Sequence, residues 1–326
     1  MRTVLAILAV VALVGAHPTL ESANTENLDN VNIVARSTSA VPASLVDDFK
    51  KYMMYSAAAY CDSVIVRQQW SCDTYCASAS SNTQVVEVFG DGESGVGFLG
   101  VQSSAKIIVA AFRGSNDAGD WSINLNFILK PAAWLSTAWG SSSSVRFMNG
   151  SNFQAPNNAK VHAGFQNSYM VAREEVLTVI QQTVAKYPDY QIIFTGHSLG
   201  AAVASLAAVD YIDKNPSDSS KVSLYTYGSP RIGNKAFADW YSTIPFRGLF
   251  RITRTKDPVP HLPPQAFTYR HFKQEYLIDA DGNTKSCTNN GDAGETSDCA
   301  DVDYFPPQIR QHLTGYYYPS GCLKEA

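Results

Sequence analysis

The segment 190–227 constrains the fold of this chain more than any other. A β-rich run, Tyr190–Thr195, leads through a glycine-flanked turn into Leu199–Ile212, an alanine-rich stretch that is apolar on nearly every side. A helix of that composition is buried. A second β-rich run, Lys221–Tyr227, follows it. Strand, buried helix and strand in this order predict parallel strands joined by a right-handed crossover.

Similar elements continue on both sides of this segment. Apolar residues recur at helical spacing over Gln166–Tyr187, and a helix over Asn234–Tyr241 is followed by a strand over Leu249–Thr253. Earlier in the chain, short runs separated by turn residues predict three strands, at Gln84–Phe89, Gly97–Gln102 and Lys106–Phe112. With 45% hydrophobic residues in 326, the chain is able to bury a large core. We therefore expect one α/β domain with a central, mostly parallel sheet and flanking helices.

The N-terminus has the composition of a secretory leader. A basic start, Met1–Arg2, precedes the apolar run Thr3–Val14 and then the small residues Gly15 and Ala16. That run is too short to be a transmembrane helix, and no later stretch reaches the roughly 18–20 apolar residues that such a helix needs. Residues 1–16 are predicted to be a signal peptide, 17–36 a propeptide and 37–326 the folded domain of a secreted, extracellular protein.

Cysteine usage agrees with secretion. Six cysteines in an oxidising compartment predict three disulfides, although spacing alone leaves the pairing open. Zinc binding is the alternative, but the chain has neither paired CxxC motifs nor HExxH, so we predict no metal. One N-glycosylation sequon begins at Asn149. A net charge of −4 argues against binding to nucleic acids or anionic membranes.

A nucleophile motif lies in the turn of the central segment. Gly196-His197-Ser198-Leu199-Gly200 has the form GxSxG, which is a weak signal alone and a stronger one between a strand and a helix. In a nucleophile elbow the two glycines allow strand and helix to approach closely, and the serine hydroxyl stands clear of the backbone. The N–H of Leu199, at the positive end of the helix, is then placed to bind an oxyanion. A chance glycine-rich turn is the alternative.

A serine nucleophile requires a base, and His312 is the best candidate. It follows the last predicted strand, in a predicted C-terminal loop, where the chain order Ser, Asp, His places the base. The other five histidines fit less well: His17 at the cleavage site, His162 before a helix, His197 pointing away from the serine hydroxyl, His261 near the acid, and His271 in a β-like run. A solvated surface role is the alternative for His312.

Two further chemical roles have candidates. Asp257 lies just beyond the run Leu249–Thr253, where a carboxylate would orient the base; an ordinary Asp-Pro turn is the alternative. Ser115 follows the buried run that ends at Phe112 and can supply a second oxyanion donor. The next residues form a short amphipathic segment that is predicted to be either a lid or an ordinary surface helix; its candidate lid residues are Asn116, Trp121, Ile123 and Leu125.

A dinucleotide motif is discarded. Residues 95–100 spell GxGxxG, but turn and strand patterns follow where a helix is needed. We therefore predict no nicotinamide or flavin cofactor, and no cofactor of another kind.

Taken together, these motifs resemble those of the filamentous-fungal class 3 lipases, a family of α/β-hydrolases that also contains feruloyl esterases. The resemblance covers nearly the whole chain after residue 36 and rests on seven segments, which are Ser56–Cys61, Phe112–Ser115, Val161–Phe165, Gly196–Gly200, Tyr227–Asn234, Asp257–Pro260 and His312–Leu313.

The resemblance implies roles for residues. It implies a triad of Ser198, Asp257 and His312, oxyanion donors Ser115 and Leu199, and a lid over 116–126. It also implies disulfides pairing Cys61 with Cys322, Cys72 with Cys76 and Cys287 with Cys299.

The predicted function is hydrolysis of acylglycerol esters by a secreted serine hydrolase that meets its lipid substrate at an oil–water interface. We expect acyl chains to bind near Leu199, Val259 and Leu313. A feruloyl or short-chain esterase is the first alternative, and an inactive lipid-binding protein on the same scaffold is the second. No pattern in the sequence specifies an oligomeric state.

Overall fold

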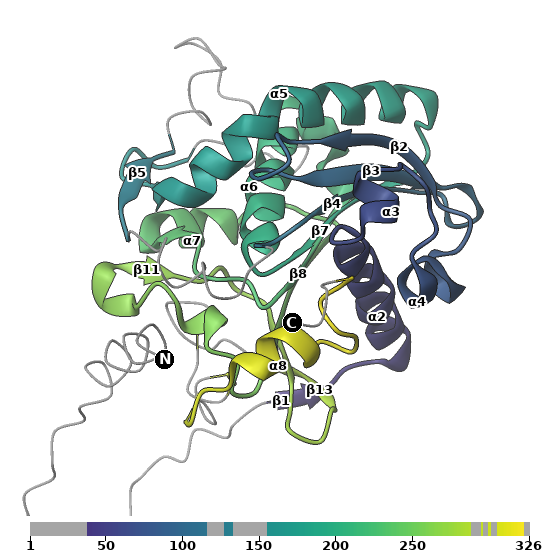
Figure 1. Cartoon of the computed structure of the whole chain (residues 1–326). Helices are drawn as coiled ribbons and strands as arrows, with labels where there is room; N and C mark the ends of the chain where they lie inside the picture. Colours follow the sequence, from purple (N-terminus) through teal and green to yellow (C-terminus); the bar gives the residue numbers. More distant parts are fainter. Residues whose placement is uncertain are drawn as a thin grey trace, which may run out of the picture.

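A nine-stranded sheet forms the centre of the molecule (Figure 1). The computed structural model describes residues 38–115, 127–132, 155–287, 295, 299–300 and 305–322. In spatial order, the strands of this part of the chain are β1 (Thr38–Ala40), β13 (Thr284–Cys287), β12 (Glu275–Ile278), β10 (Gly248–Arg254), β8 (Val222–Tyr227), β7 (Gln191–His197), β4 (Ile107–Phe112), β3 (Gly97–Gln102) and β2 (Gln84–Phe89).

The sheet is parallel at its centre and antiparallel at both edges. Strands β12, β10, β8, β7 and β4 run parallel, whereas β2–β3–β4 and β12–β13–β1 pair antiparallel. Parallel neighbours require a long crossover, which helices supply here, while a short connection is enough for antiparallel neighbours. The GxGxxG segment 95–100 leads into β3, which pairs antiparallel with β4. A dinucleotide site needs a long helix directly after this motif, and β3 and β4 occupy that place.

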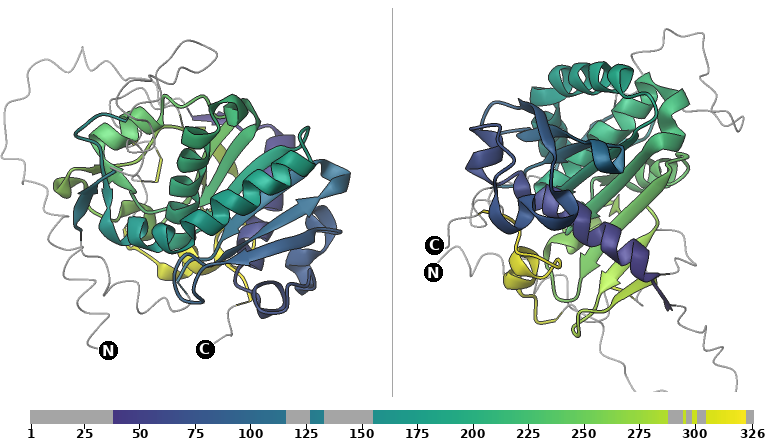
Figure 2. Two further views of the ribbon diagram at one scale, coloured as in Figure 1. Left: turned by 90° about the horizontal axis from the view of Figure 1, so that it is seen from above. Right: turned by 90° about the vertical axis from the view of Figure 1, so that its right-hand side faces the viewer.

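Helices cover both faces of the sheet (Figure 2). Helices α5 (Ala163–Lys186), α6 (Leu199–Lys214) and α7 (Lys235–Tyr241) pack on one face around a core of aliphatic and aromatic side chains. Helix α2 (Ala43–Ala58) covers the other face, where Phe49, Tyr52 and Tyr225 form an aromatic cluster. The remaining α-helices of the described part are short: α3 (Asp62–Ile65), α4 (Asp73–Cys76) and α8 (Ile309–Thr314). The predicted α/β architecture is confirmed.

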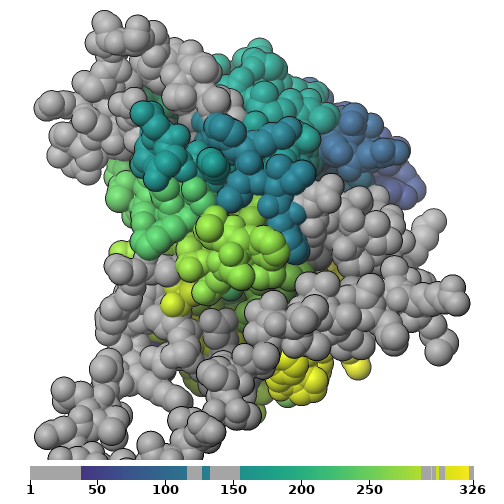
Figure 3. All heavy atoms as spheres, turned by 90° about the vertical axis from the view of Figure 1, so that its left-hand side faces the viewer, coloured from purple at the N-terminus to yellow at the C-terminus, as the bar shows by residue number. Residues whose placement is uncertain are grey.

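A small antiparallel sheet lies beside the main one. It contains, in spatial order, β11 (Tyr269–Arg270), β9 (Gly233–Asn234), β6 (Lys160–His162) and β5 (Leu129–Pro131). The half-exposed Phe267 of the 3-10 helix η7 (Gln265–Phe267) contacts Phe127, just before β5, with the rings tilted by 44°. Figure 3 shows this face, with the segment around η7 next to β5 and α8 below.

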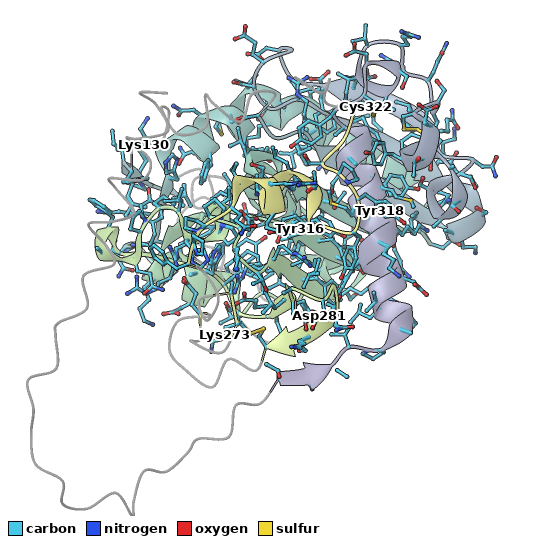
Figure 4. The ribbon with its side chains drawn as sticks, turned by 60° about the horizontal axis from the view of Figure 1, so that its bottom comes forward. Lys130, Lys273, Asp281, Tyr316, Tyr318 and Cys322 are labelled. Atoms are coloured by element: carbon cyan, nitrogen blue, oxygen red, sulfur yellow. A yellow bond between two sulfur atoms is a disulfide. The ribbon has the colours of Figure 1, made fainter. Side chains whose placement is uncertain are left out.

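Three disulfides connect the six cysteines, in the pairing that the family resemblance implies: Cys61–Cys322, Cys72–Cys76 and Cys287–Cys299. The first closes a span of 261 residues and holds the C-terminal segment, which runs from Tyr316 past Tyr318 to Cys322 in Figure 4. No described helix combines the length and the apolar character needed to cross a membrane.

Candidate active site

The turn between β7 and α6 holds Ser198 in a strained conformation. Its backbone has φ 60° and ψ −131°, a left-handed region that residues with a side chain rarely adopt. A Cβ at Gly196 would collide with the carbonyl of Gly200, and a Cβ at Gly200 would collide with the carbonyl of Phe112. Both glycines are therefore required by close backbone approach. This is the geometry of a nucleophile elbow.

Two candidate oxyanion donors flank this turn. Leu199 is the first residue of the 16-residue helix α6, so its N–H has no partner within the helix and lies at the positive end of the helix dipole. Ser115 follows β4 and the tightly packed Gly114. A Cβ at Gly114 would lie 3.1 Å from the Cβ of Ser198, so the end of β4 closely approaches the serine.

Asp257 and His312 form a buried pair. The His312 Nδ1 lies 2.9 Å from the Asp257 Oδ2, and the two side chains are 5% and 0% exposed. The other carboxylate oxygen, Oδ1, accepts a hydrogen bond of 2.8 Å from the N–H of Val259. The hydroxyl of Tyr316 donates to Oδ2. Because an imidazole nitrogen and a hydroxyl share one carboxylate oxygen, the carboxylate is held firmly in orientation.

His312 lies on helix α8, and the prediction of a loop there was wrong. Helix α8 has only six residues, too few for an apolar periodicity to show in the sequence. Its packing explains why it forms: His312 is buried, and its backbone carbonyl accepts from the ring of His197.

Ser198 and the buried pair meet at Gly228. The N–H of Ser198 bonds to the carbonyl of Tyr227 at 2.9 Å. A Cβ on the next residue, Gly228, would lie 2.9 Å from the His312 Nδ1 and 3.0 Å from the Asp257 Oδ2. The structure therefore brings the three predicted residues to one place, at the carboxyl ends of neighbouring parallel strands β7, β8 and β10.

His197 and Tyr60 also belong to this site, and sequence reasoning missed both roles. His197 packs against His312 with ring centroids 4.4 Å apart and the rings tilted by 33°, and its Nε2 lies 2.9 Å from the His312 carbonyl oxygen. Its Nδ1 lies 3.2 Å from the hydroxyl of Tyr60, which accepts from the N–H of Gly114 at 3.0 Å. Burial, together with His312, holds the pKa of His197 well below 6.5, so its ring is neutral.

Tyr316 was also missed, because a tyrosine four residues after a histidine has no distinctive pattern. Burial first, and the neighbouring Asp257 second, raise the pKa of Tyr316 well above its ordinary value. The phenol therefore stays protonated and remains a donor. A signal for Tyr60 was available, because this residue lies in the family segment Ser56–Cys61, but its role was not predicted.

The remaining histidines have other positions. His162 caps α5, where its Nδ1 accepts from the N–H groups of Gly164 and Phe165. His271 follows β11 and its Nε2 lies 2.8 Å from the carbonyl oxygen of Pro260. One group of three potential metal ligands occurs in the described residues, Glu275 with Cys287 and Cys299, but those two sulfurs are bonded to each other.

Several predictions lie outside the described residues. These are the lid residues Asn116, Trp121, Ile123 and Leu125, the sequon at Asn149, and the leader and propeptide segments 1–16 and 17–36.

Comparison with known proteins identifies the family. The family model "Lipase (class 3)" matches residues 109–267. A lipase of Rhizopus niveus is 30% identical over 310 residues, covering 93% of this chain and 71% of the relative. The chain belongs to the class 3 lipase family. It is thus an enzyme of the carboxylic ester hydrolase class, as predicted, and the family resemblance is confirmed.

Two further similar proteins extend the comparison. The secreted mono- and diacylglycerol lipase 1 of Fusarium solani is 29% identical over 285 residues, with 86% of this chain and 76% of the relative covered. A solved triacylglycerol lipase whose catalytic centre is a serine protease triad superposes with a TM-score of 0.73 at 28% identity, covering 88% of this chain and 100% of that one.

Proposed function

We propose that this class 3 lipase hydrolyses acylglycerol esters through an acyl-enzyme, with Ser198 as nucleophile, His312 as base and Asp257 as the carboxylate that orients His312. The observation that carries the proposal is the buried 2.9 Å contact between His312 and Asp257 beside a serine with φ 60°. Two features support it independently: the glycine-flanked turn, and the triad of the solved triacylglycerol lipase.

The first half of the reaction forms the acyl-enzyme. The His312 Nδ1 carries the proton that points to Asp257, so the lone pair of the other ring nitrogen, Nε2, takes the proton of the Ser198 hydroxyl. The Oγ then attacks the ester carbonyl carbon. When the tetrahedral intermediate collapses, the bond to the alcohol oxygen breaks and His312 returns the proton to the leaving alcohol. Water repeats these steps in the second half, releasing the fatty acid and restoring Ser198.

The developing oxyanion is stabilised by backbone donors. The donors in this proposal are the N–H of Leu199, the first residue of α6, and the N–H of Ser115, which follows Gly114 at the end of β4. Removing one such donor in other hydrolases costs about 10²–10³-fold in turnover. The neutral His197 and the Tyr60 hydroxyl connect the end of β4 to the carbonyl of His312, which fixes the donor and the base relative to each other.

An acylglycerol is the proposed substrate class because the class 3 relatives include lipases of triacylglycerols and of mono- and diacylglycerols. Val259, next to the acid, is buried, and Leu199 and Leu313 are partly exposed, so the three can line an acyl-binding wall. Exposed apolar side chains such as Phe267, Phe305 and Ile309 support adsorption to a lipid surface. The three disulfides support secretion.

The test of the chemistry is Ser198→Ala. The variant is expected to fold and to lose nearly all turnover, on the order of 10⁶-fold. An alkyl phosphonate should label the wild type at Ser198 and leave the variant unlabelled. Ser205→Ala is the matched control, because the hydroxyl of this buried serine donates to the carbonyl of Ala201 within α6, and its loss should leave activity intact. Normal turnover by the Ser198 variant would refute the proposal.

The test of the substrate class compares a triolein emulsion with methyl ferulate. Faster hydrolysis of triolein supports a lipase, and a preference for methyl ferulate would make the enzyme a feruloyl esterase. The rate on tributyrin should rise steeply as its concentration passes the solubility limit if the enzyme acts at an interface; a smooth saturation curve would contradict interfacial action.

A further inference from the structure

The segment 258–264, which we call the acid strap, begins one residue after Asp257 and is held by buried donors. Arg231 donates from Nη1 to the carbonyl oxygens of His261 and Pro263, the second at 2.9 Å. The ring of His271 bonds to the carbonyl oxygen of Pro260 at 2.8 Å. Three peptide carbonyls of a proline-rich segment, those of Pro260, His261 and Pro263, are thus held by side chains that are at most 4% exposed.

Arg231 is neutralised by a single carboxylate. Its Nε lies 2.9 Å from the Glu295 Oε1 and its Nη2 lies 2.5 Å from Oε2, with the two side chains 4% and 6% exposed. Glu295 also accepts from the Gln265 side chain at 2.7 Å and from the N–H of His271 at 2.9 Å. Although burial opposes its ionisation, the Arg231 guanidinium keeps the pKa of Glu295 below its ordinary value. Glu295 therefore stays charged and fixes Arg231.

Glu295 belongs to the segment that the Cys287–Cys299 disulfide closes, and both ends of that segment are tied to the sheet. Cys287 is the last residue of β13. Beyond Cys299, the N–H of Ala300 bonds to the Glu275 carboxylate on β12. That carboxylate in turn accepts from Arg251 at 3.1 Å and from Thr253 at 2.6 Å, both on β10. Strand β10 leads directly to Asp257.

A buried ion pair is a weak way to stabilise a fold, because the cost of desolvating both charges offsets their attraction. What an arginine provides here that an apolar side chain cannot is a set of directed donors for peptide carbonyls. Those carbonyls belong to the strap whose Val259 N–H bonds to the Asp257 carboxylate. The Arg231–Glu295 pair therefore helps to fix the position of the Asp257 carboxylate.

We propose that Arg231 and Glu295 are positioning residues for the catalytic acid: through the acid strap they hold the Asp257 carboxylate in line with His312, and the Cys287–Cys299 segment delivers the carboxylate that keeps Arg231 in place. The inference rests on the proposed function, since it requires Asp257 to be the acid.

The experiment begins with Glu295→Gln, assayed on a dissolved short-chain ester. The rate is expressed per active site labelled by an alkyl phosphonate, so that only folded enzyme is counted. We expect kcat to fall about 10–100-fold, as for a misplacement of about 1 Å, while KM changes by less than about threefold. The matched control is Asp210→Asn, which breaks the buried Arg173–Asp210 pair between α5 and α6, far from the strap. Its kcat per labelled site should stay within about twofold of the wild type.

A double-mutant cycle with Asp257→Asn separates positioning from general damage. If Glu295 acts through Asp257, then Glu295→Gln adds less than about twofold once the carboxylate is gone. An unchanged kcat for Glu295→Gln alone, or a loss that multiplies fully in the Asp257→Asn background, would overturn the inference. Full activity of Asp257→Asn itself would instead overturn the proposed function, so the two failures are distinguishable.

A second variant covers the case in which Glu295→Gln fails to fold. Cys287→Ser/Cys299→Ser retains both charges and frees the segment that carries Glu295. Its kcat per labelled site should fall about 3–10-fold, compared with no change for Cys72→Ser/Cys76→Ser, whose disulfide lies at α4. Equal kcat values for the two cysteine variants would count against the inference.

Discussion

The nucleophile and the acid–base pair are held by different kinds of contact. Ser198 lies in a continuous stretch, β7 to α6, and its geometry follows from two glycines and one strained residue within five positions. Asp257 and His312 are 55 residues apart, and they are fixed by hydrogen bonds from Tyr316, from the acid strap and from His197. The first region is local, whereas the second is assembled from distant parts of the chain.

This difference indicates where each region is vulnerable. The nucleophile turn has no room for a side chain at either of its two glycines, because backbone atoms touch there and are unable to move apart. The acid–base region depends on side chains and crosslinks that lie elsewhere, so substitutions far from the reacting atoms should weaken it by degrees. The predictions below test that contrast.

The largest effect is expected from Gly196→Ala. The new Cβ would meet the backbone of Gly200, which cannot rotate away, so the turn should open and turnover should fall about 10³-fold. Gly228→Ala is the counterpart in the other region, where the new Cβ would meet the side chains of His312 and Asp257 at 2.9–3.0 Å. Side chains are able to shift, so about 10²-fold is expected there. Turnover of both variants on a dissolved ester tests the order, and a Gly196 variant within tenfold of the wild type would contradict it.

The next effect concerns the Cys61–Cys322 disulfide, which ties the C-terminal segment after His312 to the end of α2. Because the crosslink spans 261 residues, replacing both cysteines by serine should lower the free energy of unfolding by about 2–5 kcal/mol. The four-residue span of Cys72–Cys76 should contribute less. Urea unfolding of the two double variants measures the difference. If both double variants lost the same free energy of unfolding, the length of the span closed by Cys61–Cys322 would not determine its stabilising effect.

The contrast also explains what the sequence was able to predict. The strand, turn and helix around Ser198 appear in the sequence as a contiguous pattern, and the predicted bounds Tyr190–Thr195 and Leu199–Ile212 differ from β7 and α6 by two residues at most. Asp257 and His312 were proposed from chain order, which gives candidates but no contacts.

The supporting residues were beyond prediction, because their roles exist only in three dimensions. Tyr316 and Tyr60 are single tyrosines among 17, and Arg231 lay in a recognised family segment without an assigned partner. Glu295, its partner, is 64 residues away. Pairings at that separation depend on how β10, β12 and the small sheet pack, and no local pattern encodes that packing.

A smaller effect on turnover is expected from Tyr316→Phe. The change removes one donor to the Asp257 carboxylate while the imidazole and the Val259 N–H remain, so kcat should fall about tenfold. Tyr317→Phe is the matched control, because its hydroxyl bonds to Thr284 on β13 and not to the Asp257 carboxylate. Turnover per labelled site should distinguish the two. Equal activities would mean that the two remaining donors hold the carboxylate without Tyr316.

The smallest effect is a pH dependence of the free energy of unfolding, which comes from the buried rings of His197 and His271. Burial is the first cause that lowers the pKa of His197, beside the nucleophile, and of His271, under the acid strap. Each folded-state pKa lies below the unfolded value near 6.5, so the unfolded chain binds more protons, and stability that is complete above pH 6.5 is lost as the pH falls. Between pH 6.5 and 5, each ring should contribute a slope approaching about 1.4 kcal/mol per pH unit. Urea unfolding across this range, for wild type, His197→Gln and His271→Gln, should show a flatter dependence in each variant. His197 adjoins both Ser198 and His312, whereas His271 bonds to the acid strap, so the variant that flattens the curve more identifies which of these buried rings resists protonation more strongly. Slopes identical to the wild type in both variants would show that neither ring is excluded from protonation in the fold.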